Sequence, residues 1–134
     1  MRLFSARRAD MEAMRGFIEV TCETLPHADR QRLVLIVEEL FCNSVEHGYG
    51  EDCDQPIWLT LAPGAEGCRL IYEDCASAHN PFAAVRDPMV DADLENRAVG
   101  GLGVFLVVQM SSSKRYERRE DRNVIELFVP LFGA

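Results

Sequence analysis

Long apolar runs are missing from the 134-residue sequence, and so is an N-terminal targeting signal. Crossing a bilayer takes roughly 20 consecutive apolar residues, and no segment approaches that length. The first residues, MRLFSARRADM, break up too soon to form the apolar part of a signal peptide. We therefore expect a cytoplasmic protein with no membrane segment, folded as one domain over residues 1–134.

Cysteine pairs at metal-binding spacing are also lacking. The chain has five cysteines, an odd number, and no CxxC pair. This pattern argues against a zinc site or a disulfide framework and fits a reducing compartment. The expected role is that of small buried or half-buried side chains for Cys22, Cys42, Cys53, Cys68 and Cys75.

Positive charge is scarce. The chain carries 14 Lys and Arg residues against 22 Asp and Glu, which gives a net charge of −8 at pH 7. A nucleic-acid-binding protein needs a basic stripe to neutralise phosphates, so direct binding to nucleic acid is not expected. An acidic protein can still bind ATP if a metal ion and backbone N–H groups screen the triphosphate.

Hydrophobic periodicity predicts helices alternating with hairpins. Apolar residues recur at helical spacing over 10–24 and again from about 28 to 47, with Pro26 between the two segments. Segments 56–62 and 68–74 alternate apolar and polar residues, which predicts a hairpin. GGLGVFLVVQM predicts a third helix, and KRYERR with NVIELFVPL predicts a second hairpin that has Ile125, Leu127 and Val129 on one face.

This order of elements predicts an α+β fold. We expect a two-layer α/β sandwich, with three helices on a mixed, mostly antiparallel sheet to which RLFS could add an edge strand. Residues 75–99 show no periodicity, and an internal loop of that length is usually functional. On the outer face of the sheet, the apolar residues Trp58, Val124 and Phe128 predict a docking patch, unless the first helix or the N-terminal strand covers them.

The segment EELFCNSVEHG, residues 38–48, places polar side chains in an otherwise apolar helix. Residues four apart share one side of a helix, so Glu39, Asn43 and His47 should form a single polar ladder. Burying an unpaired carboxylate or amide costs several kcal/mol. The ladder therefore has two interpretations. It is functional, or Glu39 is solvated, Asn43 caps a neighbouring loop and His47 is favoured by the dipole at the helix C-terminus. Taken alone, the ladder leaves both interpretations open.

Two further features suit a ligand site. VGGLGVFLV, residues 99–107, sets three glycines at the start of a helix, where the backbone can approach a ligand and free N–H groups can meet an anion. No strand precedes it, so it does not fit a dinucleotide-binding fingerprint. Asp74 ends a predicted strand, where it suits either hydrogen bonding to an adenine amino group or a turn.

Together and in this order, these segments resemble the ATP-binding domain of the GHKL superfamily, which includes gyrase and the histidine kinases. Within it, the chain looks most like the small anti-sigma-factor serine/threonine protein kinases of bacteria. EELFCNSVEHGYG is similar to the N-box, YEDCASAHNPF stands at the Asp-x-Gly box, RAVGGLGVFLV resembles the glycine box, and YERREDRNVIEL resembles the closing hairpin. The resemblance covers essentially the whole chain and implies the Bergerat ATP-binding fold.

The resemblance also implies roles for individual residues. Glu39 would be the catalytic base, Asn43 would bind Mg²⁺ as well as the nucleotide, and Asp74 would recognise adenine. The ATP lid would lie at about 75–101. The remaining nucleotide-binding positions would be His47, Ala76, Gly100, Gly101, Leu102 and Gly103.

The chain departs from the family pattern in one segment. Ala76 stands where the family has glycine, and SAH replaces the usual Pro- or Gly-containing run before NPF. If this site needs a positive φ, the alanine would weaken ATP binding by about 1–2 kcal/mol. Asn123 lies close to a position where many relatives carry a Thr facing the adenine, and we assign it no role from the sequence.

By resemblance, the expected function is that of an ATP- and Mg²⁺-dependent kinase that phosphorylates a STAS-domain antagonist and sequesters a sigma factor. The family also implies a homodimer. The sequence shows no phosphoacceptor-histidine domain, sensor or membrane segment, which disfavours an ordinary histidine kinase. The alternative is a binding module that keeps the fold but has lost kinase activity, as the altered segment 74–79 would suggest.

Overall fold

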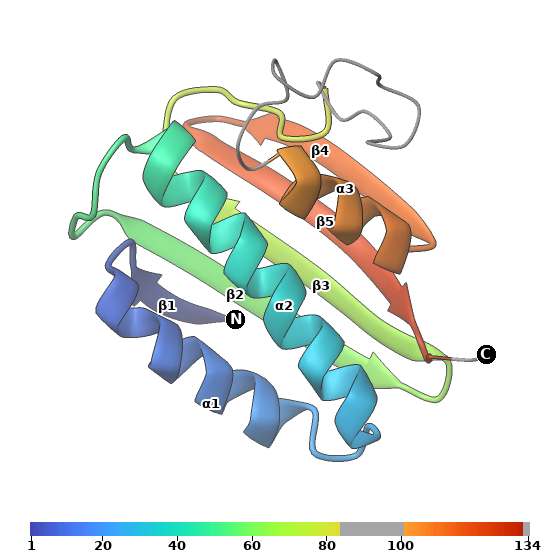
Figure 1. Cartoon of the computed structure of the whole chain (residues 1–134). Coiled ribbons are helices and arrows are strands. Elements are labelled where there is room, and N and C mark those ends of the chain that lie inside the picture. The colour runs from blue at the N-terminus through green and yellow to red at the C-terminus, as the bar shows by residue number, and fades with distance from the viewer. Residues whose placement is uncertain (84–100, 133–134) are drawn as a thin grey trace.

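Five strands and three α-helices form two layers in the computed structural model of the chain, which describes residues 1–83 and 101–132 (Figure 1). The strands are β1 (Arg2–Ser5), β2 (Pro56–Gly64), β3 (Gly67–Asp74), β4 (Ser113–Arg119) and β5 (Arg122–Pro130). The helices are α1 (Met11–Thr21), α2 (His27–Asn43) and α3 (Gly101–Met110). A short 3-10 turn, η1 (Arg8–Asp10), precedes α1, and a π-turn, η2 (Ser44–Gly48), follows α2.

The sheet has the strand order β1-β2-β3-β5-β4. Every strand pairing among the described residues is antiparallel, so the sheet is less mixed than the sequence predicted. The reason is that β2–β3 and β4–β5 are hairpins. The long connection through α3 leads from β3 to the edge strand β4, and the second hairpin then places β5 between β4 and β3, antiparallel to both. The predicted α+β sandwich with three helices is confirmed, and RLFS does form an edge strand.

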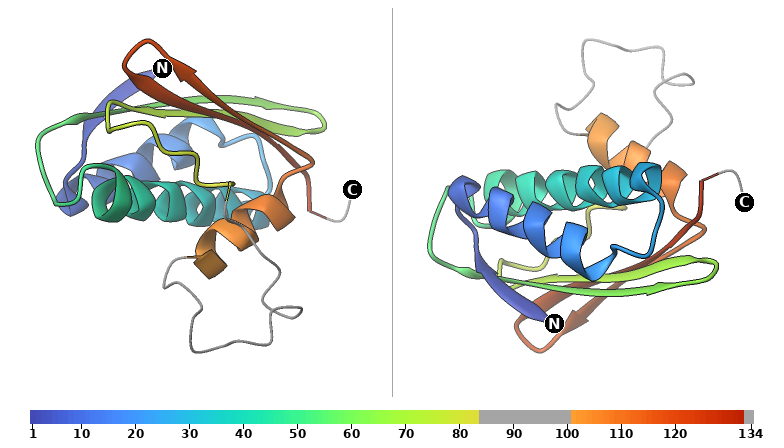
Figure 2. Two further views of the ribbon diagram at one scale, coloured as in Figure 1. Left: turned by 90° about the horizontal axis from the view of Figure 1, so that it is seen from above. Right: turned by 90° about the horizontal axis from the view of Figure 1, so that it is seen from below.

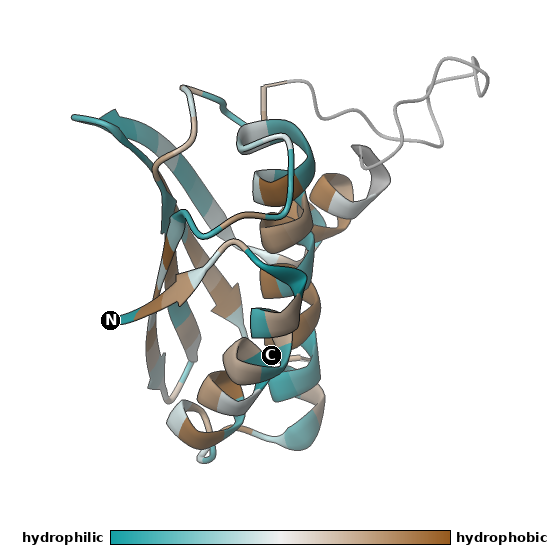
Figure 3. Ribbon diagram, turned by 90° about the vertical axis from the view of Figure 1, so that its left-hand side faces the viewer, coloured by the Kyte–Doolittle hydropathy of each residue, from teal (hydrophilic) through white to brown (hydrophobic). Residues whose placement is uncertain are grey.

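All three helices cover the same face of the sheet, as both views in Figure 2 show. α2 contributes Leu33, Ile36, Val37 and Leu40 to the core, each fully buried as its helical spacing predicted. The sheet contributes the inward residues of its strands, including Ile57, Leu59, Leu70 and Leu127. Figure 3 shows the two layers edge-on, with apolar segments in both.

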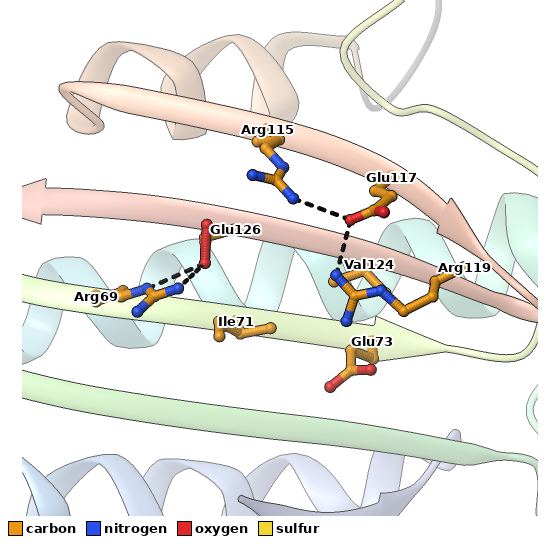
Figure 4. A pocket seen from close by; sticks show the side chains of 8 residues that line it. All are labelled: Arg69, Ile71, Glu73, Arg115, Glu117, Arg119, Val124 and Glu126. Atoms are coloured by element: carbon orange, nitrogen blue, oxygen red, sulfur yellow. Dashed lines mark hydrogen bonds and ion pairs between the residues drawn. The ribbon is translucent and has the colours of Figure 1, made fainter.

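The opposite face of the sheet carries charged side chains above its apolar residues. Val124 is 6% exposed at the floor of a shallow hollow whose rim holds the ion pairs Arg69–Glu126 and Glu117 with Arg115 and Arg119 (Figure 4). At the side of this face, the Arg122 guanidinium lies 3.6 Å from the centre of the Trp58 ring.

Docking at Trp58, Val124 and Phe128 stays a prediction, and α1, which packs on the other face of the sheet, does not cover these residues (Figure 2). Over two of them the cover comes from charged side chains of the sheet itself, with Glu117 and Arg119 beside Val124 and Arg122 over the Trp58 ring. Trp58 and Phe128 remain half-buried on this face.

Within the described residues, no helix combines the length and the apolar character that a bilayer crossing requires.

Candidate nucleotide-binding site

The polar residues of α2 lie at its C-terminal end, where the hydrogen-bonding pattern changes. α2 ends at Asn43, and in the π-turn η2 the Tyr49 N–H donates to the Ser44 carbonyl at 2.7 Å. Glu39 and Asn43 keep the four-residue spacing and are both half-buried. His47 lies in the wider turn and is exposed, so it does not continue the predicted ladder at α-helical spacing. Single π-turns in helices often mark functional sites.

Asp74, the last residue of β3, lies buried on the helix side of the sheet and accepts three hydrogen bonds. Ser44 Oγ donates to its Oδ2 at 2.6 Å, while Asn123 Nδ2 at 2.8 Å and the Ala76 N–H at 3.2 Å donate to Oδ1. Because Ser44 has a single hydroxyl proton, the Tyr72 hydroxyl at 2.8 Å donates to Ser44 in turn. A carboxylate has about four lone-pair positions, so Asp74 keeps one for a ligand.

Asn123 is the site residue to which the sequence assigned no role. In the register of β3 and β5 it stands directly opposite Asp74, and it is 4% exposed. A signal was present in the sequence. Asn123 precedes Ile125, Leu127 and Val129 at two-residue spacing, so strand alternation alone turns it toward the core.

Ala76 fits its position without backbone strain. Among the described residues, Glu120 is the only non-glycine residue with a positive φ, so the backbone at Ala76 does not require glycine. Its methyl group lies against Gly48, where an added Cβ would come within 2.9 Å of the Ala76 Cβ. The condition under which Ala76 would weaken ATP binding, a positive φ, is therefore absent.

Glu39 contacts α3. A Cβ added to Gly103 would overlap the Glu39 carboxylate, whose Cδ would be 2.6 Å away. Burial raises the pKa of Glu39, and the negative charges of Glu38 and Glu46 raise it further. A raised pKa suits a general base, because proton transfer is most efficient when the pKa of the base lies near the working pH.

The predicted lid is only partly described. Gly100 lies outside the described residues together with the rest of 84–100, whereas Gly101 and Leu102 form the first turn of α3. At the other end of the lid, the ring of His79 is 6.4 Å from that of His47. The described ends of the lid thus lie beside the π-turn at His47 and, through Gly103, beside Glu39.

Asn43 is suited to Mg²⁺. Among the described residues, no group hydrogen-bonds to its side-chain amide, and no three His, Cys, Asp or Glu residues gather as a metal cluster. Mg²⁺ prefers oxygen ligands and usually takes only one or two from the protein, with the rest from water and substrate phosphates. A single amide oxygen at Asn43 fits that mode of binding.

Comparison with known proteins places the chain in a family. The sequence model of the histidine kinase-like ATPase domain matches residues 4–129. The chain belongs to the histidine kinase-like ATPase domain family. The resemblance to the GHKL superfamily that the motifs indicated is thereby confirmed at the level of this domain, and ATP is the nucleotide that the family implies for its site.

A solved structure shares the fold of this histidine kinase-like ATPase domain. It is the histidine kinase domain of the blue-light activated histidine kinase of Erythrobacter litoralis EL346, with a TM-score of 0.53 and 16% sequence identity. The match covers 92% of this chain and 60% of that one. At this identity the likeness shows the fold alone. A comparison with curated proteins finds no match.

Proposed function

We propose that this domain is an ATP-dependent serine/threonine protein kinase of the anti-sigma-factor type. The observation that carries the proposal is the arrangement of Glu39, Asn43 and Asp74 around the end of α2. A half-buried amide, a half-buried carboxylate of raised pKa and a buried acceptor lie along one helix end and the adjoining strand. Phosphoryl transfer asks a protein mainly for positioning and charge neutralisation. These groups supply the positioning, while the charge would be neutralised by an Mg²⁺ ion held at Asn43 and by backbone N–H groups of α3.

Each residue has a distinct part in this proposal. Asp74 accepts a hydrogen bond from the adenine amino group through its remaining lone pair. Asn43 holds Mg²⁺ through its side-chain oxygen, and the ion, when bound, neutralises the charge of the phosphates. The first turn of α3 offers backbone N–H groups to the phosphates.

Glu39 acts on the phosphate acceptor. It takes the proton of the attacking serine or threonine hydroxyl while the oxygen bonds to the γ-phosphorus. The bond from that phosphorus to the oxygen bridging it to the β-phosphate breaks at the same time, so that ADP leaves. Gly103 allows this carboxylate to lie directly against α3, so the base and the N-terminal end of α3 stay close together.

The acceptor and the partners come from the resemblance of the N-box and the glycine box to those of anti-sigma-factor kinases. On that basis the acceptor is a STAS-domain antagonist, and the second partner is a sigma factor or an equivalent protein. A homodimer belongs to the same proposal.

A second candidate is a binding module with weak or no nucleotide affinity. It is favoured by Asp74, whose carboxylate already accepts three internal hydrogen bonds, and by the methyl group of Ala76 beside it. The remaining lone pair of Asp74 and the raised pKa of Glu39 favour the kinase.

Thermal unfolding with and without Mg-ATP separates the two candidates. At a hundred times its Kd, Mg-ATP raises the free energy of unfolding by about 2.7 kcal/mol, which for this chain length raises Tm by roughly 8 °C. Mg-GTP is the control, because its exocyclic oxygen cannot donate to Asp74. No shift at millimolar Mg-ATP would exclude the kinase.

Phosphoryl transfer tests the catalytic assignment. The chain is incubated with γ-labelled Mg-ATP and a STAS-domain protein of its source organism, beside a variant of that protein lacking the acceptor hydroxyl. We expect Glu39→Gln to bind ATP and to lose transfer. Undiminished transfer by this variant would mean that Glu39 is not the base.

Asn43→Ala tests the metal assignment. We expect the factor by which Mg²⁺ tightens ATP binding, measured by titration calorimetry, to fall by about tenfold or more, in line with the loss of a direct ligand. Affinity measured in EDTA serves as the control and should change little. An unchanged magnesium dependence would remove Asn43 from the metal site.

A further inference from the structure

Asn123 joins β5 to the lid root, the segment of residues 76–79 that follows Asp74. Its amide nitrogen donates to Asp74 Oδ1 at 2.8 Å and to the carbonyls of Ser77 at 3.0 Å and Ala76 at 3.2 Å. All three partners are acceptors, so the chemistry of the surroundings determines which end of the amide faces them.

The other end of the amide is equally engaged. Asn123 Oδ1 accepts hydrogen bonds from the Tyr116 hydroxyl at 2.6 Å, the His79 N–H at 3.2 Å and the Arg118 guanidinium at 3.3 Å. All three are donors. Neither aspartate nor threonine could replace this amide, because aspartate would face Asp74 and two carbonyls with a negative oxygen, and threonine has a single polar atom.

Arg118 reinforces the same contact from β4. Its guanidinium donates to the Ala76 carbonyl at 2.7 Å, so this carbonyl has partners from two strands. Arg119, the next residue, has its guanidinium on the opposite face of the sheet, where it pairs with Glu117 at 2.7 Å. The two neighbouring arginines therefore carry the same charge but differ in whether they contact the lid root.

The lid root contains no glycine, and its backbone groups are hydrogen-bonded to side chains of the β4–β5 hairpin. Ordering a residue costs about 1–2 kcal/mol of conformational entropy. A segment that is held before the ligand arrives does not add this cost to binding.

We propose that Asn123 is a positioning residue for nucleotide recognition, which with Arg118 holds the Asp74 carboxylate and the lid root in the arrangement that receives the base. This inference rests on the proposed function, since it concerns the same site. It assigns the β4–β5 hairpin to the base end of the nucleotide, while the metal and phosphate end depends on α2 and α3.

The test is titration calorimetry with ADP, in Mg²⁺ and in EDTA, well below the Tm of each variant. We expect Asn123→Ala to weaken ADP binding about tenfold or more, and Arg118→Ala about threefold. Arg119→Ala is the matched control and should stay within twofold of the unchanged chain. The factor by which Mg²⁺ tightens ADP binding should be the same in all variants, because it reports on the phosphate end.

A purely structural role would instead lower Tm and the fraction of binding-competent protein while leaving Kd unchanged. Hydrogen exchange at the His79 amide provides a readout without nucleotide, and it should speed up in Asn123→Ala and Arg118→Ala but not in Arg119→Ala. Should Asn123→Ala fail to fold, the two arginine variants decide the matter, because both side chains are exposed.

Two negative outcomes differ in what they overturn. ADP affinity unchanged in Asn123→Ala and Arg118→Ala overturns this inference alone. An unmodified chain that binds no adenine nucleotide overturns the proposed function and this inference with it.

Discussion

At the scale of single residues, the contact between Gly48 and Ala76 shows how this site accommodates an unusual side chain. Ala76 is 3% exposed, and the space for its methyl group exists because Gly48 has no side chain. A methyl group on both residues would leave their Cβ atoms 2.9 Å apart, which is closer than such atoms normally approach. The two positions are therefore coupled, although 28 residues separate them in the sequence.

Gly48→Ala should destabilise the fold by about 1–3 kcal/mol, as overpacked cores generally do. Ala76→Gly in the same chain should restore most of that loss by removing the opposing methyl group. Urea unfolding of the four members of this double-mutant cycle measures the coupling. Additive effects of the two substitutions would show that the contact does not limit the space.

At Glu39, the proposed role and the stability of the fold oppose each other. Its pKa is raised in the folded chain, mainly by burial, so the folded state binds its proton more tightly than the unfolded state does. The stability that this carboxyl contributes is present below its ordinary pKa of about 4.3 and is lost as the pH rises through the folded pKa.

Glu39→Gln should therefore raise Tm at pH 7–8, and the gain should vanish below about pH 4, where the carboxyl is protonated in both states. Tm measured across this range by circular dichroism checks the expectation. Glu23→Gln, at an exposed position after α1, is the control, because Glu38 and Glu46 themselves act on the pKa of Glu39. A variant less stable than the unmodified chain at pH 8 would contradict the assigned direction of the pKa shift.

At the scale of secondary-structure elements, the site is formed by the contacts that α2 makes with η2 and with α3. The π-turn η2 directs Ser44 toward Asp74 and Tyr72 and sets Gly48 beside Ala76. On its other side, α2 meets α3 where Glu39 faces Gly103. The site is thus assembled where two helices and a π-turn converge on the end of β3.

Gly103→Ala tests the junction of α2 and α3. The atoms nearest the added methyl group all belong to the flexible end of Glu39, so the side chain can move aside at little cost to the fold. We expect Tm to change by less than a few degrees and phosphoryl transfer to fall by about tenfold or more, since misplacing a catalytic group by about 1 Å costs up to 10²-fold. Transfer equal to that of the unmodified chain would show that the Glu39 position seen against α3 is not required.

At the scale of the whole molecule, one hydrophobic core joins the two layers. Buried residues of α1, α2 and the inner face of the sheet belong to a single cluster. The only tryptophan of the chain, Trp58, lies on the outer face of the sheet beneath Arg122. It therefore reports on the sheet, whereas far-UV circular dichroism reports mainly on the helices.

Urea unfolding followed by Trp58 fluorescence and by circular dichroism should give coincident transitions, because neither layer buries its apolar face without the other. Arg122→Ala should change the fluorescence of the folded state and cost only about 0.5–1 kcal/mol, the usual value of a cation–π contact at a surface. Separate midpoints for the two probes would mean that the layers unfold independently.

The helices and strands could be predicted because their signals are local. Spacing of Leu33, Ile36, Val37 and Leu40 defined the core face of α2, and alternation defined the strands of both hairpins. The π-turn escaped prediction, since one extra residue in a turn leaves no periodic signal over five residues. The covering of Trp58 and Val124 also escaped, because it depends on long side chains from neighbouring strands.

By itself, the sequence determined the order of the elements, the fold class and the motif residues Glu39, Asn43 and Asp74, because periodicity and motif spacing lie within short segments. Only the tertiary structure decided which groups meet them. The register of β3 and β5 places Asn123 opposite Asp74 across 49 residues, and the convergence of α2 and α3 sets Gly103 against Glu39. Such contacts follow from the packing of distant segments, which no local pattern records.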